Sequence, residues 1–156
     1  MGYFVNITNS KFRVNKEHLD DAYKALCALN DRDDLKSGGT FGGDGPNYRD
    51  PRPEGMDHHP GKWFSWMAAD YPKKYKSATE IIEALGFELT ADAEGNIIGI
   101  EYDSKIGNED HFFEELAPFV EAGSFIEWRG EDGAEWRWFF DGKQVITQTV
   151  VDKVWG

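Results

Sequence analysis

Apolar residues recur at alternate positions in two neighbouring segments within residues 124–140, near the end of the chain. A period of two is typical of β-strands that bury one face. The residues that share this face are Ile126, Trp128, Trp136, Trp138 and Phe140. An odd number of loop residues is needed to bring the two apolar faces onto the same side. We therefore expect a hairpin with the loop 131–133, in which Gly133 takes the left-handed conformation.

This loop length fixes which residues of the hairpin face each other. Trp128 then lies opposite Trp136, and Ile126 lies opposite Trp138. On the other face, Glu127 meets Arg137 and Arg129 meets Glu135, and both pairs have opposite charges. Each such pair contributes about 0.2–1 kcal/mol to a sheet. The same reasoning predicts a two-residue turn at Asp141–Gly142, which sets Trp138 opposite Val145. The charged face, with Arg129, Arg137 and Phe139, is a candidate partner-binding surface if no helix covers it.

The hairpin also carries a resemblance. The stretches "EWRGEDG" and "WRWFFDG" and the terminal "VW" resemble the C-terminal hairpin of uncharacterised small proteins from phages and mobile bacterial elements, and "WFSWM" at 63–67 fits the same pattern. The resemblance covers about the last third of the chain and that short segment. It implies a phage or accessory-gene origin and no particular activity.

A period of three to four residues predicts three helices, at 15–30, 77–86 and 108–123. Asn15 and Asn108 are the expected N-caps of the first and third helices. Ser77 and Glu80 have the spacing of a capping box at the start of the second. Pro118 should kink the third helix or end it early.

The remaining β-rich segments are residues 3–14 and a hairpin at 87–103. With the helices they give the order β-α-(loop)-α-β-β-α-β-β-β. Without the second helix and the last two strands, this is the βαββαβ order of a ferredoxin-like fold. We therefore expect one α+β domain, residues 1–156, with an antiparallel sheet, helices mainly on one face and a C-terminal hairpin extension.

Residues 31–62 differ from the rest of the chain because Gly, Pro and Asp dominate and no period appears. A loop of this length in a compact domain is usually functional or disordered. "KWFSWM" follows it directly, and Trp residues are enriched at binding hot spots, although they also anchor loops to cores. The expected loop and aromatic surface comprises Phe41, Tyr48, Arg49, His58, His59, Trp63, Phe64 and Trp66.

The net charge of −12 narrows the choice of partners. Nucleic acid and anionic membranes bind through Lys and Arg, so direct contact with either is disfavoured. A basic host protein is permitted, with Asp31, Asp33 and Asp34 as acidic contacts, although high charge also simply favours solubility. One cysteine excludes an internal disulfide, and the chain shows no signal-peptide pattern or membrane span, so a cytoplasmic protein is expected.

No catalytic motif stands out. "GGTFGGDG" lacks the Lys and Ser/Thr of a phosphate-binding loop. The adjacent His58 and His59 should point in opposite directions, and no zinc-ligand spacing supports a metal site. Cys27 falls on an apolar helical stretch, which favours an inert thiol. We therefore expect no cofactor, no metal and no catalytic residue.

These observations favour a non-catalytic acidic binding protein, a phage or mobile-element accessory factor that engages or inhibits a host protein. One alternative is a protein that binds or sequesters a small nucleotide-like molecule with the same loop and aromatic residues. A second alternative is a small enzyme that uses His58 or His59.

Overall fold

A six-stranded antiparallel sheet forms the base of the molecule. The computed structural model describes residues 3–38, 51–64, 67–106, 109–151 and 154–155. The strands lie in the order β10-β9-β8-β7-β1-β6. Their bounds are Tyr3–Lys11 for β1, Asp103–Ile106 for β6, Phe125–Gly130 for β7, Glu135–Phe140 for β8, Val145–Val151 for β9 and Val154–Trp155 for β10.

Two small sheets complete the β-structure. Strands β4 (Glu88–Ala91) and β5 (Ile97–Glu101) form a hairpin, and β2 (Ser37–Gly38) pairs with β3 (Lys62–Trp63). Only Tyr102 separates β5 from β6, and its carbonyl accepts a hydrogen bond from the Ile7 amide at 2.9 Å. Val14 and Ile97 form an isolated antiparallel β-bridge between the same two segments. The β4–β5 hairpin is therefore hydrogen-bonded to β1 and to the segment that follows β1.

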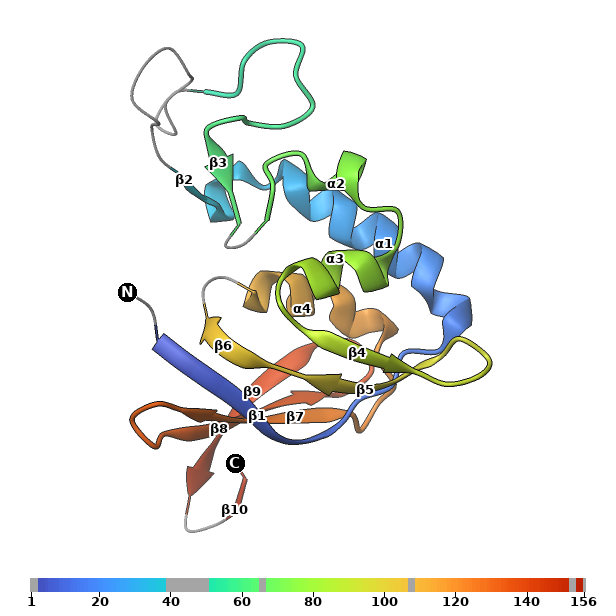
Figure 1. Ribbon diagram of the computed structural model, residues 1–156, viewed down its shortest axis with the longest axis vertical. Coiled ribbons are helices and arrows are strands. Elements are labelled where there is room, and N and C mark those ends of the chain that lie inside the picture. Colours follow the sequence, from blue (N-terminus) through green and yellow to red (C-terminus); the bar gives the residue numbers. More distant parts are fainter. Residues whose placement is uncertain (1–2, 39–50, 65–66, 107–108, 152–153, 156) are drawn as a thin grey trace.

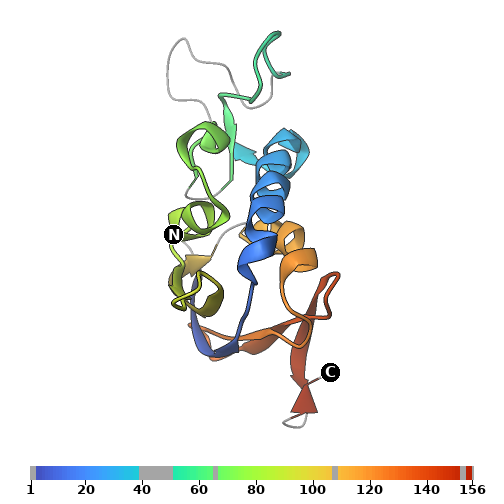
Figure 2. The same ribbon diagram turned by 90° about the vertical axis from the view of Figure 1, so that its right-hand side faces the viewer.

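The helices lie above the large sheet in both ribbon views (Figures 1 and 2). They are α1 (Leu19–Ala28), α2 (Tyr71–Lys74), α3 (Ala78–Ala84) and α4 (Asp110–Leu116), with short 3₁₀ turns η1 (Lys16–His18), η2 (Leu29–Asp31), η3 (Asp33–Leu35) and η4 (Ala117–Phe119). The sequence did not predict α2, whose four residues are too few to show a period. The molecule is thus an α+β protein with an antiparallel sheet, as expected.

The core fills the space between the helices and the sheet, and Phe113 of α4 lies near its centre. The Phe113 ring centroid lies 4.9 Å from that of Phe87 and 5.2 Å from that of Trp138. Phe12, which follows β1, packs edge-on against Phe113. Trp128 is fully buried beside the same residues. The tryptophans at 128 and 138 therefore belong to the scaffold.

The predicted register of the β7–β8 hairpin is confirmed. Trp128 pairs with Trp136, Ile126 with Trp138, Glu127 with Arg137, and Arg129 with Glu135. Gly133 has a φ of 88°, as the three-residue loop requires.

The register expected for the next turn is wrong. Trp138 lies opposite Thr147, and Val145 pairs with Phe140 instead. The Asp141 carboxylate accepts hydrogen bonds from the amides of Lys143 and Gln144, at 2.9 and 2.8 Å. Asp141 therefore opens the turn, and Gly142, with a φ of 95°, and Lys143 form its centre.

Helix termini give mixed results. The Ser77 hydroxyl accepts a hydrogen bond from the Glu80 amide at 3.1 Å, so the predicted cap of α3 is confirmed. Asn15 is the N-cap residue of the 3₁₀ turn η1 that leads into α1, as predicted, but its side chain makes no cap hydrogen bond and instead accepts one from the Arg13 guanidinium at 2.7 Å. Asn108 lies outside the described residues. The turn that contains Pro118 is 3₁₀, so α4 ends early at Leu116.

Candidate functional site

The expected loop and aromatic surface is only partly within the described residues. Phe41, Tyr48, Arg49 and Trp66 lie outside them. Trp63 is half-buried in β3. Phe64 is fully buried, with its ring centroid 5.0 Å from that of Phe112 and the Lys36 ammonium 5.9 Å above it. Phe64 is therefore a core residue, and its assignment to a recognition surface is wrong.

The two histidines have different environments. His59 is 1% exposed, and its Nδ1 accepts a hydrogen bond from the Gly61 amide at 2.9 Å. A ring nitrogen that accepts a bond carries no proton, so this contact holds the loop rather than serving a ligand. His58 is half-buried, and its Nδ1 lies 2.8 Å from the Asp57 carboxylate. Only His58 remains a candidate for a site.

His58 lines a cavity of about 150 Å³ between the end of α1, the loop at 57–58 and the start of α2. The lining residues are Cys27, Asn30, Asp31, Asp57, His58, Asp70, Pro72 and Lys73. Asp57 also pairs with Lys73 at 2.9 Å. Hydrogen bonds from His58 and then from Lys73 lower the pKa of Asp57 to about 2, so it is ionised at neutral pH. The cavity therefore brings together polar groups from three separate segments.

Cys27, His58 and Asp57 are residue types that form nucleophilic sites, but the state of the thiol argues against that role. Burial raises the pKa of Cys27, and a hydrogen bond with Tyr23 only partly offsets this. A catalytic cysteine needs its thiolate at neutral pH. Cys27 is therefore a neutral thiol in the cavity wall.

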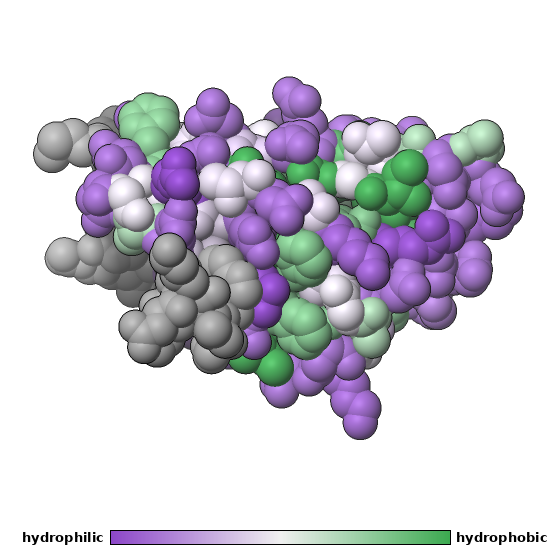
Figure 3. Space-filling view, turned by 90° about the horizontal axis from the view of Figure 1, so that it is seen from below, coloured by the Kyte–Doolittle hydropathy of each residue, from purple (hydrophilic) through white to green (hydrophobic). Residues whose placement is uncertain are grey.

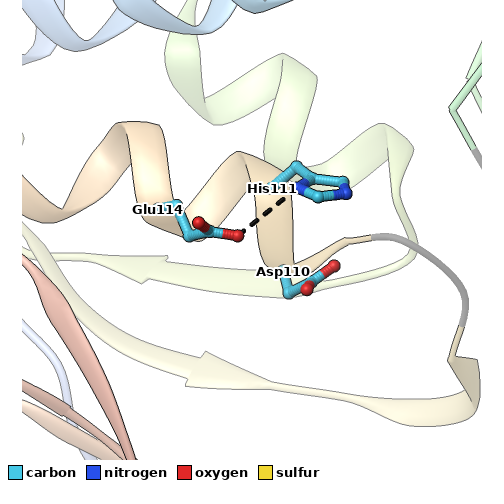
Figure 4. A group of neighbouring side chains, drawn as sticks. All are labelled: Asp110, His111 and Glu114. Atoms are coloured by element: carbon cyan, nitrogen blue, oxygen red, sulfur yellow. Dashed lines mark ion pairs between the residues drawn. The ribbon is translucent and has the colours of Figure 1, made fainter. Parts of the chain in front are cut away.

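One group of possible metal ligands occurs at the start of α4 (Figure 4). Ligand atoms of Asp110, His111 and Glu114 lie within 4.8 Å of one another, and no other group of three among the described residues does so. His111 Nδ1 lies 3.3 Å from the Glu114 carboxylate. A structural zinc site normally has four ligands. The cluster offers three ligands, two of them on exposed carboxylates, and His111 and Glu114 already pair with each other.

The sheet face opposite the helices carries the predicted residues Arg129, Arg137 and Phe139. Arg129 pairs with Glu135 at 2.7 Å. The Arg137 guanidinium lies 5.5 Å from the centroid of the Phe125 ring and 5.7 Å from that of the Phe139 ring, so it is within cation–π range of both. Figure 3 shows the molecule from this side, with apolar residues scattered among polar ones. The structure thus brings these three residues onto one face.

A hollow of about 430 Å³ lies where β4 and β5 meet β1 and β6. Its lining includes three exposed carboxylates, Glu88, Glu101 and Asp103, together with Asn6. Glu88 and Glu101 stand directly opposite each other on neighbouring strands. In the described part of the chain, none of the three carboxylates forms an ion pair. We call the surface that these three carboxylates form the acidic hollow.

The carboxylates predicted as partner contacts are different in this respect. Asp33 pairs with Lys36 at 2.8 Å and with Arg52 at 3.0 Å. Asp34 pairs with Arg32, and Asp31 pairs with Arg52. Their charges are balanced within the protein. The sequence analysis missed the acidic hollow because Glu88 meets Glu101 only through strand pairing, and no register was predicted for the hairpin at 87–103.

Comparisons of the chain with family models, curated proteins and solved structures found no match. Among the described residues, no helix has the length and apolar character needed to cross a membrane.

Proposed function

We propose that this protein is a non-catalytic acidic binding protein that engages a basic protein partner through the acidic hollow. The observation that carries the proposal is the cross-strand pair Glu88–Glu101, with Asp103 beside it and no ion pair to any of them in the described ranges. Like charges directly opposite each other destabilise a sheet. A Lys- or Arg-rich partner surface removes this repulsion on binding, so a feature that costs stability favours the complex.

Surface charge elsewhere supports this location over the loop at 31–34. Asp31, Asp33 and Asp34 already have internal cationic partners. A basic partner must displace Arg32 or Arg52 before it gains those carboxylates. The acidic hollow has no such competitor among the described residues.

A ferredoxin-like arrangement is the second part of the proposal. If β5 and β6 act as one bent strand around Tyr102, the strand order is β4-β5/β6-β1-β7, with every neighbouring pair antiparallel. This order belongs to a split βαβ fold in which α1 and α4 are the crossovers. Strands β8 and β9 then extend one edge. If the β4–β5 hairpin and the large sheet form one continuous sheet, the amides of Ile7 and Ile97 should exchange with solvent as slowly as those of β7. Hydrogen exchange measures this.

The C-terminal hairpin motif supports an origin in a phage or mobile element, and the partner is then a protein of the host cytoplasm. An acidic protein inhibits a basic one by steric block or by mimicking its anionic ligand. The half-buried Phe139 and Arg137 offer further contact area on the open face of the sheet.

The test compares three forms of the protein as immobilised bait. The variant Glu88→Gln/Glu101→Gln/Asp103→Asn removes the acidic hollow. The variant Glu17→Gln/Asp20→Asn/Asp21→Asn removes the same charge from exposed positions on η1 and α1. We expect the wild type and the variant changed on η1 and α1 to retain a basic host protein at one-to-one stoichiometry. The variant that lacks the acidic hollow should not retain it. Retention by all three, or by none, contradicts the proposal.

The small-molecule alternative has one observation in its favour, the polar cavity that His58 lines. The enzyme alternative has less support, because His59 is buried in a structural contact and Cys27 is a neutral thiol.

A further inference from the structure

We propose that this protein forms a symmetric dimer in which the outer edge of β9 pairs with the same edge of a second copy of the chain. No residue of β9 belongs to the acidic hollow. The inference therefore does not depend on the proposed protein partner.

The first observation is that the outer side of β9 presents backbone groups for a further strand. The turn before β9 is closed by a hydrogen bond from the Asp141 amide to the Gln144 carbonyl at 3.2 Å. Bonded and non-bonded pairs alternate along an antiparallel ladder, so Ile146 exchanges hydrogen bonds with β8. The amides and carbonyls of Val145 and Thr147 then point away from β8. Among the described residues, no strand pairs with them there.

Strand β10 covers a different part of the same side. It pairs with Val150 and Val151 alone, at the end of β9 that lies far from the helices (Figure 1). Residues 145–149 remain, and we call them the free edge. Ile146, Thr147 and Thr149 of the free edge are exposed.

The free edge lacks the features that normally keep a sheet edge from pairing. Among the described strands of more than two residues, β9 is the only one without a charged residue. It contains no proline, and its register with β8 runs without a bulge. The strand at the opposite edge of the sheet, β6, has four residues and carries Asp103 and Lys105. Natural proteins protect edges by short length, charge, proline or bulges, so β9 has the character of an edge that pairs.

The side chains on the open face of the sheet indicate that the added strand is a second β9. Phe125 of β7 stands opposite Phe139 of β8, which stands opposite Ile146 of β9. These three residues form an apolar row that ends at the free edge, where Ile146 is 39% exposed. A second copy related by a two-fold axis at Ile146 continues the row with its own three residues and covers both exposed isoleucines.

Backbone pairing agrees with this two-fold axis. With Ile146 opposite itself, Val145 lies opposite Thr147 of the second copy and Thr147 lies opposite Val145. Each of these pairs exchanges both hydrogen bonds, since their amides and carbonyls are the ones that point outward. An axis at Thr147 instead would bring Gln144 of the second copy to Val150, where β10 already pairs. The register centred on Ile146 is therefore the one we assign.

Charge distinguishes this dimer from the complex with a basic protein. Two copies repel each other at long range because each has a net charge of −12, whereas the strands that meet are uncharged. Salt screens the repulsion between distant exposed charges, so dimerisation should tighten as salt is added. Capture of a basic protein by the acidic hollow should weaken under the same change. The two proposals can therefore fail independently.

Sedimentation equilibrium of the full chain, from about 10 μM to about 1 mM, tests the dimer. We expect a reversible monomer–dimer equilibrium that stops at the dimer, because each copy uses its single free edge. It should be tighter in about 1 M than in about 0.1 M NaCl. A wild type that stays monomeric throughout overturns the proposal and leaves the edge to a strand of another protein. Open-ended association contradicts the two-fold register.

A matched pair of variants locates the interface. Ile146→Lys places two ammonium groups opposite each other and should weaken dimerisation by about tenfold or more. Ile98→Lys makes the same change of charge at an isoleucine of β5 that is 45% exposed, and it should dimerise like the wild type. Equal effects of the two variants place the interface elsewhere and overturn the assignment.

A disulfide tests the register even if Ile146→Lys fails to fold. Residues in a non-hydrogen-bonded antiparallel pair have Cα atoms about 4.5 Å apart, which is within disulfide range. In a Cys27→Ser background, Ile146→Cys should therefore form a covalent dimer with oxidised glutathione. Thr147→Cys is the control, because its side chain points to the other face and lies opposite Val145 of the second copy. Equal cross-linking of the two variants, or none with Ile146→Cys, contradicts the register.

Discussion

At the scale of single residues, the core depends on a few aromatic side chains that connect the helices to the sheet. Phe113 is the clearest example, since its ring contacts Phe12, Phe87 and Trp138, which come from three different parts of the chain. Such a residue cannot be removed without leaving a cavity bounded by several elements, because its neighbours are themselves fixed.

Phe113→Ala should therefore lower the free energy of unfolding by about 3–5 kcal/mol. Urea denaturation followed by tryptophan fluorescence measures this. Phe4→Ala is the matched control, because Phe4 is 47% exposed and should cost far less. Similar losses for the two variants would show that Phe113 is not central to the core.

Residue-scale predictions from sequence succeeded where the cause was local. The Ser77–Glu80 cap involves groups three residues apart, and the spacing alone identifies it. The side-chain cap expected from Asn15 does not form, because the Asn15 side chain pairs with Arg13 instead. The prediction that Phe64 lies on a recognition surface was wrong because Phe64 is buried against α4, which lies far along the chain.

At the scale of elements, the β7–β8 hairpin shows how loop length and cross-strand charge pairs determine the register of two strands. Arg129 and Glu135 face each other next to the loop, at 2.7 Å, and both are largely exposed. Cross-strand pairs of this kind contribute about 0.2–1 kcal/mol, with the lower part of the range for exposed pairs.

A charge swap tests this contribution. Arg129→Glu and Glu135→Arg should each destabilise the protein, because each places like charges opposite one another. The double variant should recover most of the loss, with a coupling energy of about 0.2–1 kcal/mol in a double-mutant cycle. Additive losses in thermal denaturation would show that the pair does not interact.

The segment at 31–36 is held by a second group of charges. Asp33 lies between the buried ammonium of Lys36 and the Arg52 guanidinium. Burial alone would raise the pKa of Asp33, but hydrogen bonds from Arg52 and Lys36 outweigh it and lower the pKa below its ordinary value of 3.8. The contribution of Asp33 to stability is therefore fully present above that value and is lost as the pH falls through the lower, folded-state pKa.

Asp33→Asn should accordingly destabilise the protein at pH 7, and the difference from the wild type should shrink below about pH 4. Denaturation curves at several pH values measure it, and Asp20→Asn serves as the control on an exposed carboxylate. A difference that stays constant as the solution is acidified would contradict the assigned ion pairs.

Element-scale prediction worked where one hairpin contained its own constraints, as in β7–β8. It failed at the next turn because the Asp141 side chain, rather than the loop length, selects the register. The cavity beside His58 could not be predicted, since α1, the loop at 57–58 and α2 meet only in the folded protein. A single sequence contains no pairing information for such contacts.

At the scale of the whole molecule, the net charge of −12 is unevenly compensated. The carboxylates at 31–34 and those on strands β7 and β8 pair with cations, whereas those of the acidic hollow do not among the described residues. A strongly charged protein destabilises itself by repulsion, and uncompensated clusters contribute most. The proposed binding surface is therefore also a place where the fold gives up stability.

Glu101→Gln should consequently stabilise the protein by about 0.2–1 kcal/mol, because it removes the like-charge contact with Glu88. The same change should weaken capture of the basic partner. Asp34→Asn alters the net charge equally but breaks the pair with Arg32, so it should not stabilise and should leave capture unchanged. Thermal denaturation and the bait assay, applied to both variants, measure the two effects. If Glu101→Gln gave no gain in stability, the hollow would carry no repulsion for a partner to relieve; a gain without loss of capture would move the partner to another surface.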